Sequence, residues 1–221
     1  MSESIPILTL DGPSGAGKGT VSRALARRLG WHYLDSGAIY RSLAIAVLDR
    51  GIALDAIEQI VAVAATMQLS FESGDEPRVL LDGADITARI GSEVCGNTAS
   101  KIAALGPVRQ ALLQKQRGFC QPPGLVADGR DMGTVVFPQA FRKIFLTASA
   151  EERAQRRYKQ LKEKGLDVNL SNLTSEIEER DRRDRERAEA PLKEAEDAIV
   201  LDTSALSIEQ VIERCLDLLQ N

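Results

Sequence analysis

The sequence predicts an α/β fold in which a five-stranded parallel sheet is flanked by helices. Short apolar runs alternate with longer helical patterns along the chain, which is typical of strand–helix–strand units. A chain of 221 residues can also bury one substantial core, and its 43 % hydrophobic content is that of an ordinary globular domain. The five apolar runs, each about as long as a buried strand, are residues 5–10, 31–34, 125–127, 143–147 and 198–201.

Charge and cysteine content exclude several classes of protein. The 28 basic and 32 acidic residues give a net charge of -4, which argues against a surface that binds nucleic acid or anionic lipid as a whole. Cys95, Cys120 and Cys215 lie far apart and form no CxxC pair, so neither a disulfide framework nor a zinc site is indicated. The chain shows no signal peptide and no long apolar run, and we therefore expect a cytoplasmic protein.

Local signals place helices between the strands. Val21, Leu25 and Leu29 recur at helical spacing, and Gly30 is suited to end that helix. Two later helices are predicted to begin with capping boxes, at Ser149 with Glu152 and at Ser207 with Gln210.

Two regions interrupt the alternation within what we interpret as a single domain, residues 1–221. Residues 68–86 contain two short apolar runs around a Gly-Asp-Glu-Pro turn and are expected to form an antiparallel hairpin insertion. Residues 151–190 are highly charged and predict two helices joined by an exposed loop at about 165–172. That loop is a candidate for a mobile lid.

A glycine-rich loop follows the first predicted strand and leads directly into a helix. Glycines allow successive backbone N–H groups to converge on a phosphate, the helix N-terminus adds partial positive charge, and Lys18 supplies a mobile cation. Gly19 stands where a Ser or Thr usually follows the lysine, and the hydroxyl comes one residue later at Thr20, a variant typical of nucleoside monophosphate kinases. A glycine-rich turn that serves only packing is the alternative. The predicted nucleotide-binding loop consists of Gly12, Pro13, Ser14, Gly15, Ala16, Gly17, Lys18, Gly19 and Thr20.

Such a loop does not by itself decide what becomes of the γ-phosphate, because GTPases, ATP-driven motors and kinases share it. No NKxD string that would recognise guanine occurs, and no apolar run ends in the paired acids of helicase-type motors. A kinase that acts on a small molecule is therefore favoured.

Three further segments carry candidate acceptor-binding residues. Arg41 follows the second strand and can bind a phosphate through its forked guanidinium, although Asp35 and Ser36 in the same segment could serve only as helix caps. Arg130 and Asp131 follow the strand at 125–127, where open sheets bind ligands, although they could form a mere surface pair.

The third segment is the charged helix near residue 180. The spacing i, i+4, i+7 predicts that Arg180, Asp184 and Arg187 share one helical face, and the alternative is a solvated face without function.

Together these segments resemble the bacterial cytidylate kinase family over essentially the full length. The resemblance is carried by GPSGAGKGT at residues 12–20, LDSGAIYR at 34–41, ADGRDMGTVVFP at 127–138 and ERDRRDRERAEAPL at 179–192. It implies a P-loop NTPase fold with an insertion that binds the nucleoside monophosphate, at about residues 36–105, and a short lid at about 153–172. It also implies transfer of the γ-phosphoryl group of ATP to CMP or dCMP, with magnesium as cofactor.

The resemblance further implies roles for individual residues. Ser36, Arg41, Arg130 and Arg187 would surround the CMP phosphate. Ser100, Arg109 and Asp131 would recognise cytosine, whereas Arg180 and Asp184 would hold the sugar. We expect catalysis to depend on Lys18, Arg130, Arg187 and Asp128, with Thr20 orienting magnesium. Asp128 either supports magnesium indirectly or orders the loop. Arg153, Arg156 and Arg157 are expected to close over the transferred group.

Two rival functions remain open at this point. An adenylate or uridylate kinase would share the loop and differ in the acceptor pocket. A nucleotide-sensing module would bind ATP without transferring phosphate. We expect a monomer whose partners are its small-molecule substrates, and neither nucleic acid nor a membrane.

Overall fold

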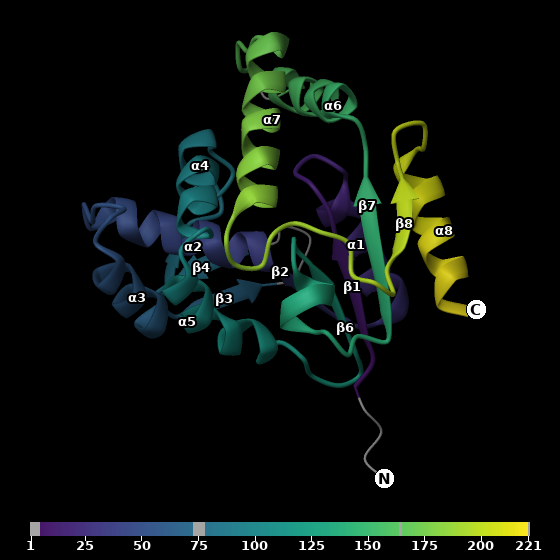
Figure 1. Cartoon of the computed structure of the whole chain (residues 1–221), viewed down its shortest axis with the longest axis horizontal. Coiled ribbons are helices and arrows are strands. Elements are labelled where there is room, and N and C mark those ends of the chain that lie inside the picture. Colours follow the sequence, from purple (N-terminus) through teal and green to yellow (C-terminus); the bar gives the residue numbers. More distant parts are fainter. Residues whose placement is uncertain (1–4, 73–77, 164, 221) are drawn as a thin grey trace. The chain divides into compact units, whose positions relative to one another are not determined.

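The computed structural model describes residues 5–72, 78–163 and 165–220, and it confirms the predicted α/β fold (Figure 1). All five predicted strands are present in one sheet whose order is β2-β6-β1-β7-β8. β1 pairs in parallel with β6 and β7, and β7 pairs in parallel with β8. The strands are β1 Ile7–Asp11, β2 His32–Asp35, β6 Leu125–Asp128, β7 Arg142–Thr147 and β8 Ile199–Asp202.

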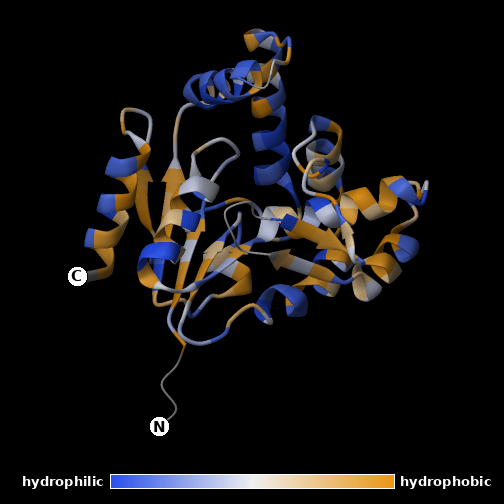
Figure 2. Cartoon of the chain, turned by 180° about the vertical axis from the view of Figure 1, so that it is seen from behind, coloured by the Kyte–Doolittle hydropathy of each residue, from blue (hydrophilic) through white to orange (hydrophobic). Residues whose placement is uncertain are grey.

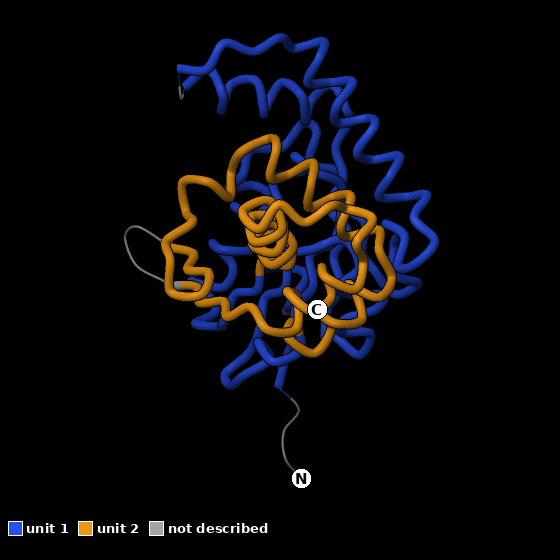
Figure 3. Tube along the Cα trace, turned by 90° about the vertical axis from the view of Figure 1, so that its left-hand side faces the viewer, with its two compact units in different colours: residues 1–34, 117–221 blue, residues 35–116 orange. Residues whose placement is uncertain are grey.

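The chain divides into two compact units (Figure 3). One consists of Met1–Leu34 together with Arg117–Asn221 and is called the core unit below. The other, Asp35–Gln116, is called the inserted unit. Each is described by itself.

The core unit is built around the contact between the sheet and two helices, α1 Lys18–Leu29 and α8 Ile208–Gln220. As predicted, Gly30 ends α1 in the left-handed conformation, where glycine is favoured. The capping box predicted for α8 is also formed, because the Ser207 N–H donates to Gln210 Oε1 at 2.9 Å and the Gln210 N–H donates to Ser207 Oγ at 3.2 Å. The core between these elements is formed by apolar side chains that include Leu8, Leu10, Val21, Leu25, Val126, Ile144, Leu146 and Val211.

Two charged helices, α6 Ala150–Glu163 and α7 Leu170–Glu186, pack against each other in the core unit (Figure 1). Both are largely hydrophilic along their length (Figure 2). The break between them is shorter than predicted, because the side chain of Asn169 accepts the Asn172 N–H at 3.2 Å and starts α7 at Leu170. A feature that the sequence did not predict is η1, one turn of π-helix at Met132–Val136.

The described residues of the inserted unit form four helices and a small antiparallel sheet. The hairpin predicted at 68–86 is confirmed in β3 Leu69–Glu72 and β4 Arg78–Leu81, and its predicted turn at 74–77 lies outside the described residues. A third short strand, β5 Ala84–Asp85, was not predicted. The helices are α2 Ser36–Asp49, α3 Ile57–Thr66, α4 Glu93–Ile102 and α5 Gly106–Arg117, whose buried side chains include Ile39, Leu43, Ile60, Ile102 and Leu112.

Within the described ranges, no helix combines the length and the apolar character that crossing a bilayer requires. Cys95, Cys120 and Cys215 are free thiols.

Candidate active site

The glycine-rich loop connects β1 to α1, as predicted, and main-chain packing dictates its shape. Gly12 has φ +141°, and a Cβ placed there would lie 1.9 Å from the carbonyl oxygen of Leu146 on β7. Only glycine fits such a close approach of two backbones. Gly17 adopts a left-handed conformation directly before the first residue of α1, so the loop ends at the positive end of the helix dipole. This geometry is suited to binding phosphate.

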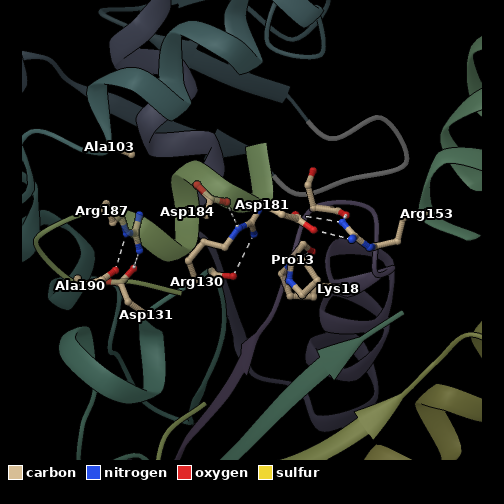
Figure 4. Close-up of polar contacts among 12 residues, drawn as sticks. Pro13, Lys18, Ala103, Arg130, Asp131, Arg153, Asp181, Asp184, Arg187 and Ala190 are labelled. Carbon is tan, nitrogen blue, oxygen red and sulfur yellow. Dashed lines mark hydrogen bonds and ion pairs between the residues drawn. The ribbon is translucent and has the colours of Figure 1, made fainter. Parts of the chain in front are cut away.

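Lys18 is buried in the loop that it belongs to. Its side chain is folded across the loop and Nζ donates to the carbonyl oxygen of Pro13 at 2.8 Å (Figure 4). Burial, and after it the charge of Arg130, lowers the pKa of Lys18 from 10.5 to about 7, against the opposing charges of Asp128 and Asp11. A bound polyphosphate would supply negative charge to this buried cation and stabilise its protonated form.

Asp128 ends β6 and lies against the start of α1. A Cβ at Gly19 would be 3.4 Å from Asp128 Oδ2, and the Tyr33 hydroxyl donates to the same oxygen at 3.5 Å. The residue after the lysine is thus packed beside a carboxylate. Thr20, the predicted magnesium ligand, is exposed in the first turn of the helix.

Arg130 and Asp184 form an ion pair between the segment after β6 and helix α7 (Figure 4). The Arg130 Nε donates to Asp184 Oδ2 at 2.9 Å, and its Nη1 donates to the carbonyl oxygen of Gly129 at 3.1 Å. Burial raises the pKa of the Asp184 carboxyl, but the charges of Arg130 and Arg180 outweigh it, and the net pKa lies below its usual value. Predicted phosphate-binding and sugar-binding residues therefore meet in one charged cluster.

Asp131 and Arg187 form a second pair, with only 4 % of each side chain exposed. Arg187 Nη2 lies 3.5 Å from Asp131 Oδ1, and Arg187 Nε donates to the carbonyl oxygen of Ala190. Arg180 and Asp184 lie within α7 as predicted, and Arg187 follows directly after the last residue of the helix. Arg187 caps α7 with an extended backbone, φ −60° and ψ 139°, because the chain leaves the helix after Glu186.

A third pair, formed by Arg153 of α6 and Asp181 of α7, was not predicted from the sequence. Arg153 Nη1 donates to Asp181 Oδ1 at 3.1 Å and also to the carbonyl oxygen of Ser14 in the loop, while its Nε donates to the carbonyl oxygen of Ala148. In this structure, Arg153, which was expected to close over the transferred group, binds the nucleotide-binding loop and α7. Arg156 likewise binds Glu152 and Thr203 within the core unit. Neighbours this distant in sequence leave no local pattern.

Four predicted acceptor-binding residues lie in the inserted unit. Ser36 Oγ donates to Gln116 Oε1 at 2.6 Å, and Arg41 Nη1 donates to the carbonyl oxygen of Ile90 at 3.0 Å. Arg109 Nη1 donates to the carbonyl oxygen of Ala103 at 3.3 Å. Ser100 Oγ is buried and has no hydrogen-bond partner among the described residues. A buried hydroxyl without a partner is costly, and a ligand could satisfy it.

The predicted site residues thus fall into two groups. The core unit brings together the loop, Asp128, Arg130, Asp131, Arg180, Asp184 and Arg187, and the inserted unit holds Ser36, Arg41, Ser100 and Arg109. Their individual roles stay predictions. Asp11 and Asp181, which both contact elements of the site, were not among them.

Comparison with known proteins decides between the rival families. The family model for cytidylate kinase matches residues 8–221. The chain belongs to the cytidylate kinase family. A cytidylate kinase of Methylococcus capsulatus is 63 % identical over 221 residues, covering 100 % of both chains, and that of Shewanella denitrificans is 57 % identical over 220 residues, covering 98 % of this chain and 97 % of the relative. Adenylate and uridylate kinases are thereby disfavoured.

A solved structure supports the fold of this cytidylate kinase family member. A gluconokinase from Sinorhizobium meliloti 1021 superposes with a TM-score of 0.50, covering 97 % of this chain and 91 % of that protein, at 15 % sequence identity. At this identity the likeness concerns the fold alone, and it agrees with the predicted P-loop kinase architecture.

Proposed function

We propose that this protein catalyses ATP + CMP (or dCMP) giving ADP + CDP (or dCDP). The observation that carries the proposal is the burial of Lys18 at the end of a glycine-rich loop, in a chain that belongs to the cytidylate kinase family. Burial, together with the charge of Arg130, lowers the pKa of Lys18 to about 7. A bound anion with several negative charges would stabilise these two neighbouring cations.

The donor phosphates would be bound by the loop N–H groups and Lys18. Magnesium would be held mainly by phosphate oxygens and water, with Thr20 as protein ligand and Asp128 beside it. The described residues contain no group of three or more His, Cys, Asp or Glu able to hold a metal, which fits a metal that arrives with the nucleotide. When bound, it would neutralise charge on the phosphates.

The acceptor would be recognised by residues of both groups. Ser36 and Arg41 of the inserted unit, and Arg130 and Arg187 of the core unit, would bind the CMP phosphate, while Arg180 and Asp184 would hold the sugar. Ser100, Arg109 and Asp131 would recognise cytosine. A carboxylate such as Asp131 accepts a hydrogen bond from the cytosine amino group, whereas uracil would place an oxygen there and lose that bond.

The chemistry proposed for these residues is alignment and charge stabilisation. Phosphoryl transfer passes through a loose transition state and needs no strong base. Lys18, Arg130 and Arg187 would stabilise the charge on the moving group, and a lid at about residues 153–172 would exclude water, which otherwise competes as acceptor. The monomeric state and the cytoplasmic location stay predictions.

A coupled ADP assay across CMP, dCMP, UMP and AMP tests this function. We expect turnover with CMP and dCMP, weak turnover with UMP and none with AMP. ATP binding without turnover on any of the four monophosphates would favour the nucleotide-sensing alternative. Turnover with AMP or UMP as the best acceptor would show that the acceptor has been assigned wrongly.

A further inference from the structure

Asp11, the last residue of β1, carries a buried carboxylate that binds the backbone of the segment after β6. Its side chain is turned toward the start of η1, where Oδ1 accepts the Met132 N–H and Oδ2 accepts the Gly133 N–H, both at 2.8 Å. The first N–H groups of a helical turn have no partner within the turn. Both carboxylate oxygens therefore satisfy backbone donors that would otherwise be buried without one.

These bonds fix the backbone on one side of Arg130 and Asp131. On the other side, the Gly129 N–H donates to the carbonyl oxygen of Leu10 at 3.0 Å. Residues 129–133 are thus attached to the end of β1 at both ends, and the two candidate acceptor-binding side chains lie between the attachments. The same strand end continues directly into the nucleotide-binding loop at Gly12.

A carboxylate is electrostatically expensive at this position. Burial raises the pKa of Asp11 from 3.8 to about 6, with a further rise from the charge of Asp131, against the two N–H bonds and the charge of Lys18. An asparagine would avoid this cost, but its amide has only one acceptor oxygen, and its NH₂ group would face one of the two N–H donors. Only a carboxylate can accept both N–H groups. The electrostatic cost of burying it is therefore linked to holding the backbone at Met132 and Gly133 in one position.

We propose that Asp11 is a positioning residue for acceptor specificity, which holds the backbone of residues 129–133 so that Asp131 meets the base. Asp11 itself touches no substrate in this mechanism. The inference rests on the function proposed above, in which Asp131 recognises cytosine. It adds that the selectivity of Asp131 for CMP over UMP depends on a carboxylate located on a different strand.

The test compares Asp11→Asn with Asp131→Asn and with the double variant. Asp11→Asn is expected to raise the KM for CMP about tenfold and to lower the CMP-to-UMP ratio of kcat/KM about tenfold, since one buried N–H loses its acceptor. The KM for ATP should change by less than about twofold. The CMP-to-UMP ratio of the double variant should lie within about twofold of the ratio of Asp131→Asn alone. Both changes act through the Asp131 carboxylate, so their effects should not add.

Two further variants keep the test decisive. Asp85→Asn is the matched control, since the exposed Asp85 accepts the Thr87 N–H at 2.9 Å in the inserted unit and an asparagine oxygen can still accept that bond. Gly133→Ala should disturb the contact between Asp11 and the Gly133 N–H by displacing the backbone at residue 133. Its Cβ would lie 2.9 Å from Thr9 Oγ1 and 3.0 Å from Lys143 Cδ. It should reproduce the loss of CMP selectivity, and it carries the test should Asp11→Asn not fold.

The outcomes separate the inference from the proposed function. If Asp131→Asn lowers the CMP-to-UMP ratio and neither Asp11→Asn nor Gly133→Ala does, the inference is overturned while the proposed function stands. If Asp131→Asn leaves the ratio unchanged, the base-recognising role of Asp131 is refuted, and the inference falls with it. A drop in melting temperature without any change in KM would assign Asp11 a merely structural role and would also overturn the inference.

Discussion

Arg153 and Asp181 form a buried ion pair that joins helices α6 and α7, with 3 % and 6 % of their side chains exposed. Arg153 Nη2 lies 2.5 Å from Asp181 Oδ2 (Figure 4). The same guanidinium binds the carbonyl oxygen of Ser14. The pair thus connects the nucleotide-binding loop to the helix that carries Arg180 and Asp184.

Asp181→Ala should destabilise the fold strongly, because it leaves the Arg153 charge buried without a counter-ion. We expect a loss of about 3–5 kcal/mol in the free energy of unfolding, measured by urea denaturation. Glu179→Ala is the control, since Glu179 pairs with Arg182 on the exposed surface and should contribute less than about 1 kcal/mol. Similar losses of unfolding free energy in both variants would show that the buried pair stabilises the fold no more than an exposed pair does.

Lys18→Ala should slow turnover strongly and leave CMP binding nearly intact. Loss of a charged contact to the transferred group is expected to lower kcat by about 10²- to 10³-fold. A coupled ADP assay measures kcat, and calorimetric titration with CMP measures the acceptor affinity. Near-normal turnover would remove Lys18 from the mechanism.

Lys18→Met should raise thermal stability, and more at pH 6.5 than at pH 9.5. The pKa of Lys18 is lowered from 10.5 in the unfolded chain to about 7 by burial and then by the charge of Arg130. Between these values the unfolded state binds the additional proton, so the destabilising effect of Lys18 is largest below pH 7 and decreases as the pH rises toward 10.5. Denaturation should show a gain about 3 kcal/mol larger at pH 6.5, and an equal gain at both pH values would contradict the burial of a charged group.

Arg187→Ala should raise the KM for CMP and slow transfer together. It removes a cation proposed to bind the acceptor phosphate, and it also leaves Asp131 without its 3.5 Å partner. Steady-state kinetics with each substrate varied in turn would separate the two nucleotides. A change confined to the KM for ATP would mean that Arg187 serves the donor.

The sequence was sufficient for the elements whose signals are local. The strands were predicted because buried parallel strands are short continuous apolar runs, and α1 and α8 were predicted because Gly30 and the Ser207 capping box act within one helical turn. The loop and Lys18 were predicted for the same reason, since their chemistry lies in consecutive residues.

What the sequence did not predict depends on contacts between distant segments. Asp181 and Arg153 are 28 residues apart, and Asp11 meets Met132 across 121 residues, so neither pairing leaves a local pattern. Helical spacing also does not reveal where a helix ends, and α7 ends at Glu186, one residue before Arg187. The π-turn η1 was missed because it depends on N–H acceptors supplied by β1.

The close approach of Gly12 to the Leu146 carbonyl limits how this loop can vary. Because the obstacle is main chain of a neighbouring strand, no compensating side-chain change can make room for a methyl group. A library randomised at position 12 and selected for growth on the encoded activity should return glycine alone, whereas Thr20, which is exposed, should accept replacements that retain a hydroxyl.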